Sequence, residues 1–313
     1  MGIDLSVNIG RLKLKNPVMV ASGTFGYAEE FKDYLNLNSL GAVITKTITL
    51  KPRAGNPMPR TCETAAGMLN AIGLENSGVE VFIKEKLPVL KKIGTPIIVS
   101  IASEGNPEEF TILAQRLDKI KEIAALELNI SCPNLRTTVG TARRVAPALI
   151  SQNAQATYGV VKIVRKVTDK TIITKLSPNV TDIAEIAKAA QDAGSDAVSL
   201  VNTFLGMAID INKRKPKLAN ITGGLSGPAI KPIALRMVWE VFKTVDIPVI
   251  GIGGIMTAQD ALEFIIAGAA AIEVGTANFV NPSAASDIIE GLTKYLKDNK
   301  IKTLKGLIGS IKT

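Results

Sequence analysis

One short segment contains the most reactive side chain of the sequence. Cys132 lies in Asn129-Ile130-Ser131-Cys132-Pro133-Asn134, where two asparagines flank it and Pro133 stiffens the turn. The chain contains no histidine, which excludes Ser-His and Cys-His nucleophilic pairs, histidine zinc sites and a histidine general base. Cys132 is therefore the best candidate for a proton acceptor. The alternative, a small buried thiol, is more typical of a cysteine within a strand.

Two glycine turns predict a phosphate-binding site. Gly251-Ile252-Gly253-Gly254 and Gly275-Thr276 each follow an apolar run, and Thr257 can cap the helix that begins after the first turn. Glycine lets backbone N–H groups approach phosphate oxygens, and a helix N-terminus adds a favourable dipole. The alternative is a pair of ordinary tight turns, but their position after adjacent strands favours a phosphate-bearing ligand.

Two lysines end apolar runs. Lys46 and Lys175 each close a segment that otherwise reads as a buried strand. A lysine that points into a barrel mouth is costly to desolvate without an anionic partner, so the two indicate an anionic cofactor or substrate. The alternative is a lysine that reaches back to solvent at the rim.

The elements that must position these residues are short β-branched runs and amphipathic stretches in alternation. Near-continuous apolar runs suit parallel strands buried on both faces, and their alternation with helices implies a parallel sheet. The sequence predicts eight strands, over residues 17–21, 42–46, 96–101, 126–130, 171–176, 197–202, 248–252 and 271–275. Helices are expected over residues 107–123, 155–166, 181–193, 234–245 and 257–267.

Eight such units favour an α/β fold of the (β/α)8 TIM-barrel type, with an open doubly wound sheet as the alternative. Residues 5–15 alternate around Gly10 and predict a short N-terminal hairpin over one end of the barrel. Function gathers at the C-terminal ends of the strands in such barrels, and these ends are polar throughout. They read Ser22-Gly23-Thr24, Lys46-Thr47, Ser100, Asn129 with Ser131 to Asn134, Lys175, Asn202-Thr203, Gly253-Gly254 and Gly275-Thr276.

The composition limits the class of protein. The 313 residues are 46% hydrophobic and 21% charged without a low-complexity tract, so we expect one barrel domain over residues 1–313. The net charge of +9 is dispersed and aromatic residues make up only 4%, which argues against nucleic-acid binding. Two cysteines without ligand spacing argue against a metal site. Without a basic leader or an apolar run of membrane length, we expect a cytoplasmic protein that does not contact membranes.

Longer motifs resemble the class 1 dihydroorotate dehydrogenases. Segment 129–134 is similar to their catalytic loop, which uses cysteine where the membrane-bound class 2 enzymes use serine. Segment 70–76, Asn-Ala-Ile-Gly-Leu-Glu-Asn, resembles the family's substrate loop, and segments 55–60 and 219–228 match further motifs. The resemblance extends from about residue 2 to residue 311. Its details resemble class 1B, the catalytic subunit of the NAD-linked enzyme, rather than the fumarate-using class 1A.

This resemblance implies oxidation of (S)-dihydroorotate to orotate in de novo pyrimidine biosynthesis, with FMN bound in the barrel. Cys132 then acts as the general base that removes the C5 proton, while hydride passes from C6 to the flavin. The residues implied to hold the substrate are Lys46, Asn70, Ala71, Ile72, Gly73, Leu74, Asn129, Asn134, Asn202 and Thr203. Those implied to bind FMN are Ser22, Lys46, Thr47, Ser100, Asn129, Lys175, Val201, Gly227, Gly253, Gly254, Gly275 and Thr276.

The resemblance also implies partners. Class 1B chains form a homodimer within a heterotetramer, and the electron-transfer subunit carries FAD and a 2Fe–2S cluster and passes electrons to NAD. The two cysteines of this chain are too few to ligate the cluster, which would lie on the partner.

The sequence departs from the family's pattern at two places. Ser100 replaces a frequent asparagine, and the loop over 135–152 lacks the family's Gly-Gly and Phe-Gly pairs, so its closure and the specificity need not follow the family's.

Two other functions are compatible with these residues. A related flavin enzyme reduces uracil-type pyrimidines, which lack the 6-carboxylate of orotate, but segment 70–74 together with Lys46 favours a carboxylate substrate. A non-catalytic barrel that serves as a binding or scaffold subunit is disfavoured, because Cys132, both lysines and both glycine turns are present.

Overall fold

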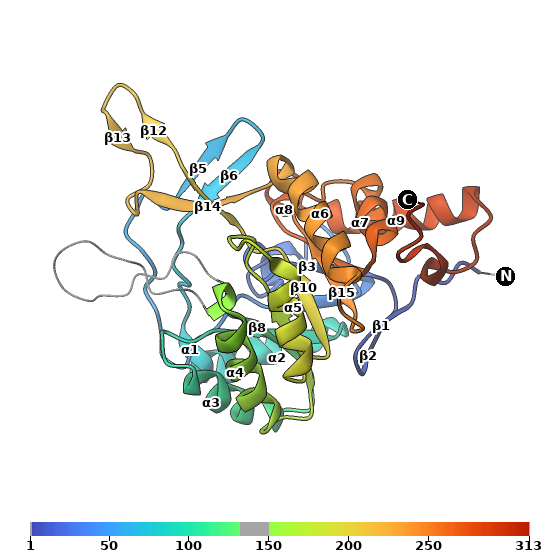
Figure 1. The fold of residues 1–313 in the computed structure, drawn as a ribbon, viewed down its shortest axis with the longest axis horizontal. Helices are drawn as coiled ribbons and strands as arrows, with labels where there is room; N and C mark the ends of the chain where they lie inside the picture. The colour runs from blue at the N-terminus through green and yellow to red at the C-terminus, as the bar shows by residue number, and fades with distance from the viewer. Residues whose placement is uncertain (1, 132–149, 313) are drawn as a thin grey trace.

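The computed structural model describes residues 2–131 and 150–312, and a closed barrel of parallel strands lies at its centre (Figure 1). The strands follow one another around the barrel in chain order, and the last pairs with the first. They are β3 (Val18–Val20), β4 (Ala42–Ile44), β7 (Ile97–Ile101), β8 (Ile123–Asn129), β9 (Thr171–Lys175), β10 (Ala197–Leu200), β15 (Val249–Ile252) and β16 (Ala269–Val274). The predicted (β/α)8 barrel is confirmed, and the open sheet is wrong.

Helices cover the outside of the barrel, because each longer one has a buried apolar stripe. In α5 (Ile183–Asp192), Ile186, Ala187 and Ala190 are buried at the spacing of one helix face. The others are α1 (Gly78–Val81), α2 (Leu87–Leu90), α3 (Glu108–Asp118), α4 (Ala154–Arg165), α6 (Lys231–Phe242), α7 (Ala258–Ala267), α8 (Ala277–Val280) and α9 (Ala284–Asp298). A π-helical turn (Phe82–Lys86) joins α1 to α2. Within the described ranges, no helix is long and apolar enough to cross a membrane.

The predicted N-terminal hairpin is present as β1 (Val7–Ile9) and β2 (Leu12–Leu14), which pair antiparallel. Gly10 has a φ of 56° in the turn, a conformation that glycine adopts without cost. Ile9 and Leu14 are fully buried, and a Cβ on Gly10 would lie 2.7 Å from the Cβ of Asp196, just before β10. The hairpin therefore packs at the N-terminal end of the barrel, away from the rim where the strands end.

A second, four-stranded sheet is not predicted by the sequence patterns. Its order is β11-β14-β6-β5, with β5 (Thr61–Thr64), β6 (Gly67–Asn70), β11 (Phe204–Met207) and β14 (Thr222–Ser226). Figure 1 shows it standing out from the barrel, next to the small hairpin of β12 (Ile209–Asp210) and β13 (Lys215–Pro216). Several of its strands contain glycine and are half-exposed, so no regular alternation marks them.

Short 3-10 turns complete the connections, and none belongs to a predicted element. They are Glu29–Phe31, Leu37–Ser39, Lys91–Ile93, Ile150–Gln152, Pro228–Ile230 and Leu304–Leu307. The predicted helix over 107–123 is shorter than expected: α3 ends at Asp118, a turn follows, and Ile123 begins β8.

A capping box starts the helix after the glycine turn of β15. The Thr257 hydroxyl accepts a hydrogen bond from the backbone N–H of Asp260, and the Asp260 carboxylate accepts one from the backbone N–H of Thr257. Thr257 is thus the N-cap that the sequence predicts. This cap fixes the start of α7 next to the glycine turn at the barrel rim.

We expect Thr257→Ala to lower the free energy of unfolding by about 1 kcal/mol, because a helix N–H loses its partner. Chemical denaturation followed by circular dichroism measures the change, with Thr257→Ser as the control that keeps the hydroxyl. Equal stability of the alanine and serine variants would contradict the capping role.

Candidate active site

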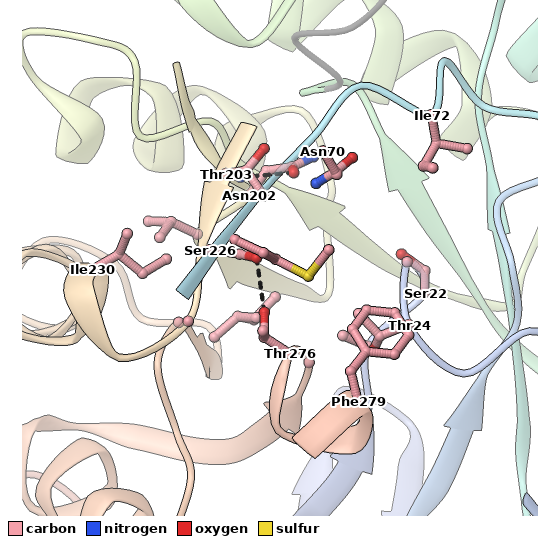
Figure 2. A pocket seen from close by; sticks show the side chains of 18 of the residues that line it. Ser22, Thr24, Asn70, Ile72, Asn202, Thr203, Ser226, Ile230, Thr276 and Phe279 are labelled. Atoms are coloured by element: carbon pink, nitrogen blue, oxygen red, sulfur yellow. Dashed lines mark hydrogen bonds between the residues drawn. The ribbon is translucent and has the colours of Figure 1, made fainter. Parts of the chain in front are cut away.

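A cavity of about 340 Å³ opens at the C-terminal ends of the barrel strands. This volume is in the range usual for small-molecule and cofactor sites. One wall consists of barrel strand ends, and the other comes from β6, β14 and the segments next to them. Figure 2 shows Asn70, Asn202 and Thr203 close together on one side, and Thr276 and Phe279 on another. The accessory sheet therefore completes a site that the barrel rim begins.

Most of the residues predicted from the sequence meet in this cavity. Those that line it are Ser22, Lys46, Thr47, Asn70, Ile72, Gly73, Leu74, Asn129, Lys175, Val201, Asn202, Thr203, Gly227, Gly253, Gly254, Gly275 and Thr276. Ala71 does not line it but packs with Leu69, and Ser100 hydrogen-bonds Thr47 at 2.9 Å from behind the wall. The contacts of all these residues with a ligand stay predictions. Cys132 and Asn134 lie outside the described residues, as does most of the loop over 135–152.

Amide and hydroxyl side chains form one hydrogen-bonded chain along the wall. Asn202 Nδ2 donates to Ser131 Oγ at 2.9 Å, and Ser131 Oγ donates to Asn129 Oδ1 at 3.3 Å. Asn129 Nδ2 then donates to Thr47 Oγ1 at 3.1 Å. The chain links three barrel strands at the point where the backbone continues to Cys132. Fixed amides of this kind can recognise the carbonyl and N–H groups of a polar ring.

The loop after β6 is held in place by the segment that precedes β5. Asn56 Nδ2 donates to the carbonyl oxygen of Ala71 at 3.0 Å, and Arg53 Nε donates to that of Gly73 at 2.7 Å. Leu74 has a φ of 58°, which is rare for a bulky residue and persists only where neighbouring contacts maintain it. These contacts orient the backbone of the loop toward the cavity.

The glycine turns line a different part of the cavity from the loop after β6. Gly254 has a φ of 71°, and a Cβ there would lie 2.8 Å from the Cβ of Lys231, so only glycine fits. Gly227 has a φ of 99°. Thr276 Oγ1 donates to Ser226 Oγ at 2.8 Å, which brings two hydroxyls to the same part of the cavity (Figure 2). Backbone N–H groups and hydroxyls are the donors that a phosphate group requires.

Lys175 forms the floor of the cavity. Its Nζ lies 3.2 Å from Glu273 Oε2, 3.5 Å from Glu127 Oε2 and 3.4 Å from Ser22 Oγ. Burial alone would lower the pKa of Lys175, but the two carboxylates outweigh it and hold the pKa above its ordinary value. Lys175 therefore remains a cation that can stabilise an anionic ligand. Lys46, the other predicted lysine, lines the cavity from the end of β4.

Glu127 and Glu273 are not among the predicted site residues, although the sequence contains their signal. Each interrupts an apolar strand, in Leu126-Glu127-Leu128 and Ile272-Glu273-Val274, and both side chains are fully buried. A glutamate in a strand that is buried on both faces needs an ionic partner. Desolvation, opposed by Lys175 and reinforced by Glu127, raises the pKa of Glu273 to about 8. Ser226, Met68 and Phe279 are further lining residues that were not predicted.

Comparison with known proteins identifies the family. The family model of dihydroorotate dehydrogenase matches residues 4–296. This chain belongs to the dihydroorotate dehydrogenase family. It is 57% identical over 311 residues to a protein of Geotalea uraniireducens (strain Rf4), named dihydroorotate dehydrogenase B (NAD(+)), catalytic subunit, with 99% of both chains covered. A protein of the same name from Geobacter sulfurreducens is 57% identical over 309 residues, 98% of each chain.

These matches confirm the resemblance to dihydroorotate dehydrogenases, which are flavin-dependent enzymes, and its NAD-linked type. A solved structure of the dihydroorotate dehydrogenase of Eimeria tenella, in complex with ferulenol, has a TM-score of 0.79 to this chain. It covers 98% of this chain and 88% of the other at 24% identity, and so supports the fold.

The raised pKa of Glu273 predicts a pH-dependent stability. The folded chain holds this proton more tightly than the unfolded chain, so its contribution to the free energy of unfolding falls as the pH rises from about 4.5 to about 8. We therefore compare the wild type with Glu273→Gln. The free energy of unfolding of the wild type minus that of the variant should decrease as the pH is raised from about 4.5 to about 8.

Denaturation of both proteins at the two ends of this pH range measures the difference. Glu290→Gln changes an exposed glutamate of α9 in the same way and serves as the control. A difference between wild type and Glu273→Gln that stays constant with pH would show that Glu273 is ionised like an ordinary carboxylate.

Proposed function

We propose that this chain oxidises (S)-dihydroorotate to orotate with FMN, in de novo pyrimidine biosynthesis, and passes the electrons through a partner subunit to NAD. One observation carries the proposal. The loop after β6, the amides of Asn129 and Asn202, and the glycine turns meet in a single cavity, in a chain that is 57% identical to proteins named for this activity.

The donors of the cavity fit FMN. The turns with Gly254 and Gly227 and the hydroxyls of Ser226 and Thr276 suit the phosphate at one end. Lys175, at the floor, suits the part of the ring that gains negative charge on reduction. A bound FMN supplies the acceptor for the hydride that leaves C6 of dihydroorotate.

The other wall fits the planar, anionic substrate. Lys46 and the backbone of the loop after β6 suit its carboxylate. Asn70, Asn129 and Asn202 offer amide donors and acceptors for the ring carbonyl and N–H groups. Holding the substrate in this way fixes its C5–C6 bond relative to the groups that react with it.

Cys132 is the proposed general base. Its Sγ accepts the C5 proton, so that the electrons of the C5–H bond form the new C5–C6 double bond as hydride leaves C6. A cysteine thiol ordinarily titrates near pH ~8.5, which suits a proton acceptor in a chain without histidine. The preceding Ser131, which bonds Asn129 and Asn202, anchors the backbone next to this base.

A catalytic subunit requires a partner that takes up its electrons. Because the relatives are named catalytic subunits, we infer a second subunit that accepts the electrons. The resemblance to class 1B implies that this subunit carries FAD and a 2Fe–2S cluster. We also infer a homodimer of this chain. Leu205, Met207 and Ile209 are 56%, 50% and 55% exposed on the accessory sheet and its neighbour strand. Exposed apolar groups of this kind are typical of interfaces and support contact with a second copy.

The alternative activities are less well supported. The relatives are named for dihydroorotate and for NAD(+), which favours neither a uracil-type reductase nor a fumarate-linked class 1A enzyme. The cytoplasmic location and the closure of the loop over 135–152 stay predictions.

Cys132→Ala should keep FMN bound but slow its reduction by dihydroorotate about 10²- to 10⁴-fold, the usual contribution of a general base. Anaerobic mixing with dihydroorotate, followed by the loss of flavin absorbance, measures the rate, and dithionite reduction is the control for an intact flavin site. Undiminished reduction would remove Cys132 from the mechanism. A colourless wild-type chain that cannot be reconstituted with FMN would overturn the flavin assignment.

Gly254→Ala should weaken FMN binding by about tenfold or more, because alanine disfavours the left-handed turn by about 1–2 kcal/mol. Riboflavin, which lacks the phosphate, should bind the variant and the wild type alike. Fluorescence titration of the flavin-free chains measures both affinities. Gly159→Ala in α4 is the matched control, since a Cβ there meets no atom within 4 Å. Equal losses for FMN and riboflavin would argue against phosphate binding at this turn.

A further inference from the structure

Three ionisable side chains lie together beneath the cavity. Lys175 lines it, whereas Glu127 and Glu273 lie deeper inside the barrel and do not. The Lys175 side chain is 6% exposed and both glutamates are 0% exposed. We call these three residues the charged floor. Each comes from a different strand, β9, β8 and β16, so the floor is built by the barrel itself.

The charged floor contains two acids and one base. Ser22 bonds Lys175 at 3.4 Å and Ser199 bonds Glu127 at 3.5 Å, but neither serine brings a charge. The Oε1 atoms of both glutamates have no hydrogen-bond partner among the described residues. With both glutamates ionised, one buried negative charge would be uncompensated, which is strongly unfavourable.

Within residues 2–131 and 150–312, the surroundings of Glu273 add no other charge. The strands that pair with β16 on its two sides place Ile252 of β15 and Met19 of β3 in register with Glu273. Lys175 and Glu127 are the titratable groups that act on it in the described part of the chain. Burial, the charge of Glu127 and a hydrogen bond with Glu127 raise the pKa of Glu273, while Lys175 lowers it, and the result is about 8.

We propose that Glu127 and Glu273 share one proton and act on a bound flavin through Lys175, as positioning residues. The free energy of the charge that the flavin gains on reduction then depends on whether this shared proton is present, and therefore on pH. The proposal rests on the proposed function in one respect, that a flavin occupies the cavity above Lys175. With the proton in place the floor is neutral, and after its loss the floor carries one negative charge.

The balance of charge gives the coupling its direction. Two-electron reduction adds two electrons and one proton to the ring, so one negative charge appears on the cavity side of Lys175. That charge opposes loss of the shared proton. In the alkaline range, where the floor has lost its proton, Glu127 and Glu273 therefore take up one proton from water during reduction. Two electrons are then accompanied by two protons, rather than by one.

The midpoint potential of the bound FMN, measured against pH by spectroelectrochemistry, tests this coupling. A two-electron couple shifts by about 30 mV per pH unit for one proton and about twice that for two. We expect the shallower slope below about pH 8 and the steeper one above it, where the floor loses its proton. Cys132→Ala is the background for all samples, because a free thiol titrates in the same range.

Two isosteric variants identify the residues responsible. Glu273→Gln and Glu127→Gln each leave one acid opposite Lys175, so each should keep the shallow slope at every pH. Above about pH 8 their potentials should be more positive than that of the parent. Glu290→Gln, at the exposed face of α9, should retain the change of slope. A single shallow slope in the parent, or a change of slope that persists in both floor variants, would overturn the proposal.

Infrared spectroscopy of the full chain prepared without flavin separates this proposal from the proposed function. The shared proton predicts a C=O band of a protonated carboxyl group at pH 7, which disappears as the pH is raised beyond about 8. The band should be absent from Glu273→Gln and from Glu127→Gln. A wild-type chain without this band refutes the shared proton. A chain that shows the band but binds no flavin supports the shared proton and overturns the proposed function instead.

Discussion

Pairing of β16 with β3 closes the barrel, and the rest of the structure depends on this closure. A closed parallel sheet leaves no edge strand and brings the carboxyl ends of all its strands to one rim. Ser22, at the end of the first barrel strand, thereby comes within 3.4 Å of Lys175, at the end of the fifth. If the same strand order were left open between β16 and β3, these two strands would lie at opposite edges of the sheet, and the cavity could not form between their ends.

Closure also decides the charge inside the barrel. Glu273 belongs to the last strand and Glu127 to the fourth, yet both contact Lys175. Buried charges are tolerated only with partners, so the three residues depend on one another and on the geometry that joins their strands. The same contacts hold Lys175 at the floor of the cavity. The same three residues therefore affect both the stability of the barrel interior and the charge at the floor of the cavity.

The two ends of the barrel have different roles. At the N-terminal end, the β1–β2 hairpin buries Ile9 and Leu14 and covers the interior. At the C-terminal end, the four-stranded sheet stands beside the cavity and supplies the loop with Leu74 in a left-handed conformation. Hydrogen bonds from Arg53 and Asn56 maintain that loop. Packing thus stabilises the N-terminal end of the barrel, while the cavity opens at the C-terminal end.

The sequence by itself determined the barrel, because β-branched runs and helix-period stripes are local signals that each segment carries alone. It also determined most of the wall residues, since polar ends of parallel strands must converge once the sheet closes. Cys132 was reached by the absence of histidine, together with a loop that resembles a known family, and its placement stays a prediction.

Only the tertiary structure decided which residues lie behind the wall and which remote strands pair. Ser100 ends a strand as the wall residues do, but it turns to Thr47 instead of the cavity. The accessory sheet joins residues 61–70 to residues 204–226, and no local pattern specifies such a pairing. Glu127 and Glu273 read as isolated charges in apolar strands, and only barrel closure places Lys175 between them. Contacts between distant segments are set by how the chain packs as a whole, which is why local sequence signals did not reveal them.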